Sequence, residues 1–136
     1  MNNVLAVIAA AGEGKRFGGN TPKQYIKLNG KTVIESSVKP FIDSEIITKI
    51  IIVVSKNDLE IENQDFYNSK KVEVIYGGDK RQISIFKALQ HEDDNYEFVI
   101  THDAARPNII EDDISNLLKD IKAVSYTHLT LPTIFR

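Results

Sequence analysis

Two short, unbroken runs of apolar residues, at residues 4–10 and 50–54, constrain the fold more than any other feature of the chain. Because neither run alternates with polar residues, both faces of each segment have to be buried, as in a parallel sheet covered on both sides. Shorter β-rich runs at 72–76 and 98–101 end in turns or loops rich in Gly, Asp or Pro. The sequence therefore predicts at least four strands.

Segments with helical periodicity separate these strands. A first helix is indicated around Ile34, Val38 and Phe41, and Pro40 should kink or shorten it. A second is predicted over residues 81–90, with Ile83, Phe86 and Leu89 on one side and Ile85 and Ala88 beside them. A third is predicted over 110–121, where three acidic residues stand at the expected N-terminus. The polar segment 57–71 is expected to be a short helix or a loop. Strands that alternate with helices imply an α/β fold with right-handed crossovers and a mainly parallel sheet.

Composition limits the classes of protein to consider. A length of 136 residues suits about one domain, and a net charge of −2 with a pI near 5.9 gives no general attraction to nucleic acid. Without cysteine there is no disulfide and no Cys-based zinc site, which fits a reducing cytoplasm. The first apolar run is too short to span a bilayer and lacks the basic start of a secretory signal, so we expect no membrane partner.

The loop after the first strand, AAAGEGKRFGGNTPKQY at residues 9–25, is rich in glycine and basic residues. Its glycine spacing fits neither the dinucleotide fingerprint nor the Walker pattern. Backbone N–H groups freed by glycine can still surround phosphate oxygens, and Lys15, Arg16 and Lys23 can neutralise them. The alternative is a solvated surface loop with incidental charge.

Two further motifs should open at the same edge of a parallel sheet, where ligands bind. YGGDKRQIS, at 76–84, is either part of such a site or an ordinary connection in which Lys80 and Arg81 are a solvated helix start. ITHDAARP, at 100–107, offers Asp103 as a metal or substrate ligand or as a turn cap. A single histidine such as His102 is more often a hydrogen-bonded structural residue than a catalytic base. Arg106 could pair with Asp103 or with a nearby glutamate.

The motifs AAGEGKRFGGNTPKQY, GGDKRQIS and HDAARP, in this order, resemble the 2-C-methyl-D-erythritol 4-phosphate cytidylyltransferases of the non-mevalonate isoprenoid pathway over about residues 3–122. The resemblance implies a Rossmann-like nucleotidyltransferase fold with flanking helices. It also implies a cytoplasmic, homodimeric transferase that joins CTP to methylerythritol phosphate, releases pyrophosphate and uses Mg²⁺.

By motif position, the family's residues map onto this chain. Arg16 and Lys23 match the catalytic pair that stabilises the transition state. Asp103 matches the acid on the substrate and metal side, and Arg106 a supporting arginine there. The nucleotide-binding positions are Ala10, Ala11, Gly12, Gly14, Lys15, Gly78 and Ser84.

The resemblance divides the chain into a CTP-binding part, 1–122, and a tail, 123–136, that looks foreign to the family and derived from an adaptor sequence. Family members continue into further strands, a dimer-forming arm and basic residues for methylerythritol phosphate. We therefore expect a fold that is incomplete at its C-terminus, with weak or no activity and doubtful dimerisation. The alternatives are a cytidylyltransferase for ribitol 5-phosphate or another polyol phosphate, and an inactive nucleotide-binding fragment. A dinucleotide-dependent oxidoreductase is disfavoured by the glycine spacing.

Overall fold

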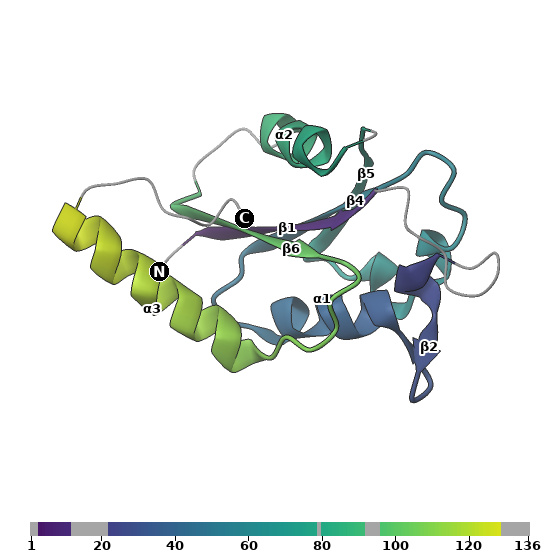
Figure 1. The fold of residues 1–136 in the computed structure, drawn as a ribbon, viewed down its shortest axis with the longest axis horizontal. Helices are drawn as coiled ribbons and strands as arrows, with labels where there is room; N and C mark the ends of the chain where they lie inside the picture. Colours follow the sequence, from purple (N-terminus) through teal and green to yellow (C-terminus); the bar gives the residue numbers. More distant parts are fainter. Residues whose placement is uncertain (1–2, 12–21, 79, 92–95, 129–136) are drawn as a thin grey trace.

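A computed structural model describes residues 3–11, 22–78, 80–91 and 96–128 of the chain (Figure 1). Its centre is a four-stranded sheet in the order β5-β4-β1-β6, in which every neighbouring pair is parallel. The strands are β1 (Val4–Ala10), β4 (Lys49–Val54), β5 (Val72–Tyr76) and β6 (Phe98–Asp103). All four predicted strands and their parallel arrangement are confirmed, and β6 extends two residues beyond the predicted end.

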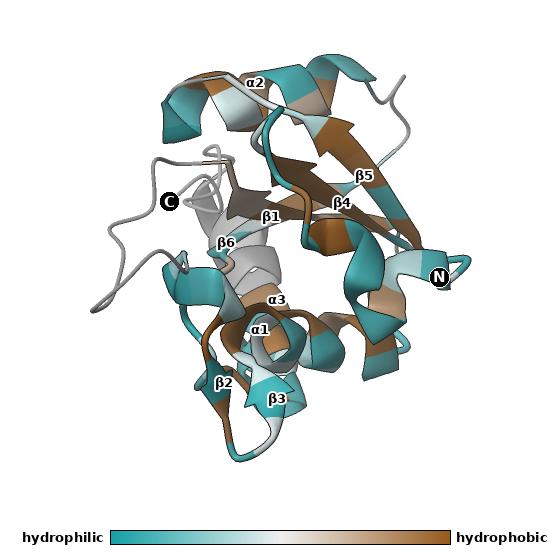
Figure 2. Ribbon diagram, turned by 90° about the vertical axis from the view of Figure 1, so that its right-hand side faces the viewer, coloured by the Kyte–Doolittle hydropathy of each residue, from teal (hydrophilic) through white to brown (hydrophobic). Residues whose placement is uncertain are grey.

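The sheet separates two hydrophobic cores, as the unbroken apolar runs predict. Val4, Ala6 and Ile8 of β1 face one core, whereas Leu5 and Val7 face the other. The first core is covered by α1 (Val33–Asp43) and α3 (Glu111–His128), and the second by α2 (Arg81–His91) (Figure 1). Figure 2 shows the strands as a hydrophobic layer between helices whose outer surfaces carry hydrophilic residues.

Short elements fill the connections. The strands β2 (Lys27–Leu28) and β3 (Lys31–Thr32) form an antiparallel hairpin, whose turn residues Asn29 and Gly30 have φ of 56° and 84°. Positive φ at both positions is the signature of a type I′ turn, which Asn-Gly favours. The hairpin was not predicted.

The segment 57–71 contains two 3₁₀ helices, η2 (Ile61–Asn63) and η3 (Asp65–Asn68), and a third, η1 (Lys23–Tyr25), follows the glycine loop.

The expected shortening of α1 at Pro40 is wrong. The helix begins after Thr32, whose side chain accepts a hydrogen bond from the Glu35 N–H at 3.2 Å, and it continues past Pro40 to Asp43. Pro40 lies in the last turn, so it removes only the bond that its own N–H would have given to the Ser36 carbonyl. Burial of Phe41, the next residue, favours continuation of the helix.

The sequence pattern did not decide which face of α2 is buried. Ile83 and Phe86 are 43% and 58% exposed, and Ser84, Ile85 and Ala88 are the residues buried against the sheet. Apolar residues occur around much of this helix, so periodicity alone could not select the inward face. In the observed orientation Ser84 faces the turn after β5, where its Oγ donates a hydrogen bond to the Gly78 carbonyl.

Lys71 caps the C-terminal end of α1 from a distant part of the chain. Its Nζ donates hydrogen bonds to the carbonyls of Phe41, Ile42 and Ser44 at 3.2, 3.0 and 2.6 Å. These carbonyls belong to the end of a helix, where a cation is favourable. Burial lowers the pKa of Lys71 from its ordinary value, and the negative charges of Asp43 and Glu111 oppose this shift only in part.

We expect Lys71→Met to lower the free energy of unfolding by about 1–3 kcal/mol, because the aliphatic stem stays and the charged hydrogen bonds are lost. Urea unfolding measures the change. Lys70→Met is the matched control, since Lys70 is an exposed neighbour, and it should change stability by less than about 0.5 kcal/mol. Equal effects of the two substitutions would show that the cap contributes nothing.

Candidate functional site

The order of the strands creates a crevice between β1 and β6. From β1 the chain proceeds to β4 and β5 on one side, and then returns to place β6 on the other side of β1. In open α/β sheets, ligands bind outside the carboxyl ends of the strands at such a reversal. A pocket of about 330 Å³ lies at this position. It is lined by residues 9–11 at the end of β1, by Lys23 and Gln24, by Arg81 and Ser84 of α2, and by residues 103–106 at the end of β6 and just beyond it.

The pocket brings together most of the predicted site residues that the structure describes. Those that line it are Ala10, Ala11, Lys23, Ser84, Asp103 and Arg106. Gly78 lies beside it, because the Ser84 Oγ donates to the Gly78 carbonyl at 3.3 Å. The predicted site residues Gly12, Gly14, Lys15 and Arg16 lie outside the described residues. The individual roles of all these residues stay predictions.

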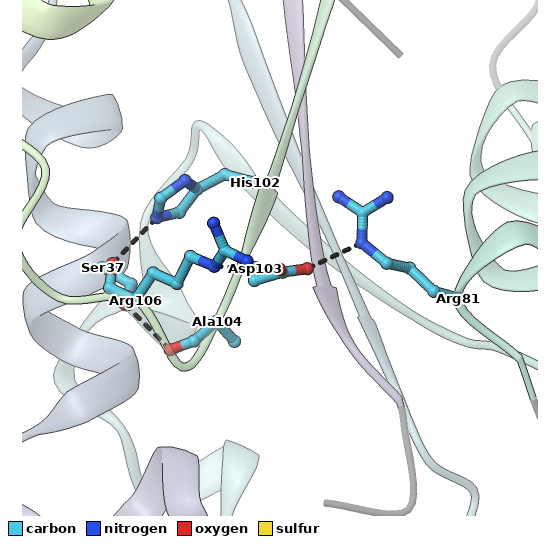
Figure 3. A network of polar contacts seen from close by, with 6 residues as sticks. All are labelled: Ser37, Arg81, His102, Asp103, Ala104 and Arg106. Atoms are coloured by element: carbon cyan, nitrogen blue, oxygen red, sulfur yellow. Dashed lines mark hydrogen bonds and ion pairs between the residues drawn. The ribbon is translucent and has the colours of Figure 1, made fainter. Parts of the chain in front are cut away.

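Asp103 is held between two arginines (Figure 3). Arg81 Nε lies 2.7 Å from Asp103 Oδ1, and Arg106 Nε lies 3.3 Å from Asp103 Oδ2. Arg81 reaches Asp103 across the crevice from α2, and it is a site residue that the sequence reasoning missed. No local signal separated it from a solvated helix start, because the contact exists only once α2 and β6 stand on either side of the crevice. For Arg106, the structure selects Asp103 as the partner.

The loop after β6 is fixed by backbone and side-chain hydrogen bonds. Ala104 N–H donates to the Ala9 carbonyl at 3.0 Å, which ties the loop to the end of β1. The buried Ser37 hydroxyl of α1 lies 2.8 Å from the Ala104 carbonyl and 3.0 Å from that of Val33, and shares its hydrogen between them. Asp103, the last residue of β6, is therefore followed directly by a residue anchored to both β1 and α1.

His102 has the structural role favoured by the sequence analysis. Its Nε2 lies 2.9 Å from the Arg106 carbonyl (Figure 3). Because a carbonyl only accepts, Nε2 carries a proton and is the donor of this hydrogen bond. The ring centroid lies 5.4 Å from that of Phe41. Burial lowers the pKa of His102, outweighing the raising effects of the Arg106 carbonyl and the Asp103 charge.

Glycine is required where β5 turns into α2. A Cβ on Gly77 would lie 2.3 Å from Val53 Cγ1 and 2.5 Å from Ser84 Oγ, and one on Gly78 would lie 2.3 Å from Ile83 Cγ2. The absence of these side chains lets the first turn of α2 pack directly over the strand ends. As a result, Ser84 and the Gly78 backbone lie next to the pocket.

The described lining of the pocket is cationic, with Lys23, Arg81 and Arg106 against the single acid Asp103. Such a cluster favours anionic ligands despite the net negative charge of the chain. In the described part of the chain, no group of three or more His, Cys, Asp or Glu side chains could hold a metal ion. None of its helices is long and apolar enough to cross a bilayer. The parallel sheet and the cationic pocket at the strand reversal define an α/β protein with a site suited to anionic ligands.

Comparison with known proteins gives the family. The family model described as 2-C-methyl-D-erythritol 4-phosphate cytidylyltransferase matches residues 4–132, so the chain belongs to this family. The resemblance seen in the three motifs and the Rossmann-like nucleotidyltransferase fold are thereby confirmed. The match extends beyond residue 122, where the family part was expected to end. The foreign origin proposed for 123–136 stays a prediction.

Individual relatives agree with this assignment. The 2-C-methyl-D-erythritol 4-phosphate cytidylyltransferase of Wigglesworthia glossinidia brevipalpis is 37% identical over 118 residues, which are 87% of this chain and 51% of the relative. The crystal structure of the Francisella tularensis protein of the same name is 35% identical with a TM-score of 0.69, covering 90% of this chain and 53% of that one. The 4-diphosphocytidyl-2C-methyl-D-erythritol synthase of Anaerococcus prevotii is 28% identical with a TM-score of 0.75, covering 89% and 51%. The chain thus spans about half the length of the curated relatives it matches.

His102 should make stability depend on pH. Its lowered pKa means that the unfolded chain binds a proton near pH 6.5 more readily than the folded chain does. The stabilisation is therefore complete above about pH 6.5 and is lost as the pH falls below that value. We expect the urea midpoint to decrease between about pH 7.5 and 5.5, and to decrease less in His102→Gln. Parallel curves for the two proteins would contradict this assignment.

Proposed function

We propose that this chain is the nucleotide-binding part of a cytidylyltransferase that transfers CMP from CTP to 2-C-methyl-D-erythritol 4-phosphate and releases pyrophosphate. The observation that carries the proposal is the convergence of Lys23, Arg81 and Arg106 on one pocket at the strand reversal, in a member of this family. The cytoplasmic location and the homodimer that the family resemblance implies stay predictions, with dimerisation of this chain expected to be doubtful.

The charge of the pocket suits the chemistry of this reaction. An oxygen of the acceptor phosphate attacks the α-phosphorus of CTP, and pyrophosphate leaves in line. The attacking phosphate is already ionised, so no general base is required. The two reactants repel one another, and fixed cations can hold them together and neutralise the crowded phosphorus. Lys23, with Arg16, is assigned this role, and the engagement of His102 with a backbone carbonyl agrees with a reaction that needs no imidazole base.

Asp103 is compatible with the proposed Mg²⁺ site. Mg²⁺ commonly uses one or two carboxylates together with substrate phosphates, so a single acid in the pocket suffices. Both carboxylate oxygens of Asp103 accept from arginines in this structure. To hold the ion, Asp103 would exchange one of these contacts. When bound, Mg²⁺ supplies positive charge that offsets the triphosphate.

Other residues at the pocket suit the nucleoside. Ala10 and Ala11 are small, which leaves space at the end of β1. Ser84 is 1% exposed and interacts with the Gly78 carbonyl, so its hydroxyl and the neighbouring backbone offer fixed hydrogen-bonding groups. The family resemblance implies that Gly78 and Ser84 recognise cytosine, and their place beside the pocket is compatible with that role.

The proposal is tested first by binding and then by turnover. Calorimetry with CTP and Mg²⁺ should show binding that UTP and ATP do not match. Pyrophosphate release is then measured with methylerythritol phosphate and, separately, with ribitol 5-phosphate. Failure to bind CTP would overturn the proposal. CTP binding without turnover would identify the chain as a binding fragment, and release with ribitol 5-phosphate alone would reassign the acceptor.

We expect Arg16→Ala and Lys23→Ala each to slow turnover by about 3 kcal/mol or more in the barrier, which is a loss of more than 100-fold. Should turnover be too slow to measure in this chain, the CTP dissociation constant of Lys23→Ala is the readout, with an expected rise of about tenfold. Lys27→Ala is the matched control, because Lys27 is exposed on β2 and does not line the pocket. A loss below threefold for both Arg16→Ala and Lys23→Ala would refute their assignment.

A further inference from the structure

The single-turn helix η1 carries three consecutive residues with different surroundings. Lys23 is exposed and lines the pocket, whereas Gln24 and Tyr25 are buried. A 3₁₀ helix has three residues per turn, so consecutive side chains leave it about 120° apart. Two of the three directions of η1 are therefore occupied by buried side chains. If both are anchored, the direction in which Lys23 leaves the turn is fixed as well.

Tyr25 is anchored to the loop that follows β4. Its hydroxyl donates to Asp58 Oδ2. The other oxygen of Asp58 accepts from the N–H groups of Glu60 and Ile61 at 2.9 and 3.1 Å, and the Asp58 N–H donates to the Ser55 carbonyl at 3.0 Å. Asp58 is thus held in place independently of Tyr25. Burial, followed by the bond to Asp58, raises the pKa of the Tyr25 phenol, so the hydroxyl remains a donor at ordinary pH.

Gln24 is anchored to the end of β1. Its Nε2 donates to the Ala10 carbonyl at 3.3 Å, at the end of β1. The backbone of the turn closes through Tyr25 N–H to the Pro22 carbonyl at 3.0 Å and Ile26 N–H to the Lys23 carbonyl at 3.3 Å. The turn that carries Lys23 is therefore attached to the end of β1 and to the loop that follows the neighbouring strand β4.

We propose that Tyr25 and Asp58 are positioning residues that hold Lys23 at the pocket through the η1 turn. The inference rests on the proposed function, because it takes Lys23 as a ligand-contacting cation. It adds two residues that lie outside the set lining the pocket. A purely structural Tyr25–Asp58 bond would stabilise the fold without any dependence on the side chain at position 23.

A double-mutant cycle separates positioning from general stabilisation. Tyr25→Phe removes only the hydroxyl and keeps the buried ring. We expect it to raise the dissociation constant of CTP with Mg²⁺ about fivefold in the wild-type background and less than about 1.5-fold in the Lys23→Ala background. Tyr67→Phe, at a half-buried tyrosine of η3, is the matched control and should leave affinity unchanged. An equal effect in both backgrounds, or no effect in either, would overturn the proposal.

A nucleotide-free measurement makes the test independent of the proposed function. Hydrogen exchange of the amides of residues 25 and 26 reports on the η1 turn itself. Tyr25→Phe should accelerate their exchange about tenfold or more while the amides of β1 keep their protection, and unchanged exchange would overturn the positioning role. A wild-type chain that fails to bind CTP would instead overturn the proposed function. Asp58→Asn, which retains an oxygen for the Glu60 and Ile61 amides, replaces Tyr25→Phe in both measurements if that variant unfolds.

Discussion

Burial of β1 on all sides is the constraint on which the rest of this structure depends. The strand pairs with β4 along one edge and β6 along the other, and its alternate side chains enter two separate cores. A shift of one residue in its register would exchange the contents of both cores, so the register is strongly specified. Because the carboxyl end of β1 forms one wall of the pocket, the same packing that stabilises the domain also determines where ligand-contacting backbone can lie.

Charge at the pocket is arranged so that the acid and the cations constrain one another. Asp103 pairs through one carboxylate oxygen with Arg81 of α2 and through the other with Arg106, three residues further along the chain, so one carboxylate offsets two guanidinium charges. An incoming polyphosphate could take over part of this neutralisation, because guanidinium groups bind phosphate as well as carboxylate. The ion pairs are partly exposed, so exchanging them requires little desolvation.

The sequence predicted those features that depend on local pattern and chain order. Unbroken apolar runs identified the strands, and the rule that parallel strands end at one edge placed Lys23, Ser84 and Asp103 together. Contacts between residues far apart in the chain could not be predicted, such as those of Arg81 with Asp103 and of Tyr25 with Asp58. The inward face of α2 was ambiguous because apolar residues surround it. The Asn29–Gly30 hairpin had a recognisable signal in the sequence, and the prediction overlooked it.

The bonds that join the loop after β6 to the rest of the protein have a consequence for folding. Ala104 meets Ala9 and Ser37, which are far away in the chain, so the pocket cannot exist until β6 has docked beside β1. Such long-range pairing forms slowly compared with local helices. A ligand of this pocket consequently binds only molecules whose sheet is assembled through β6, and stabilises them by mass action over partly folded ones. Binding of a ligand at this pocket thereby reports selectively on molecules in which β6 has joined the sheet.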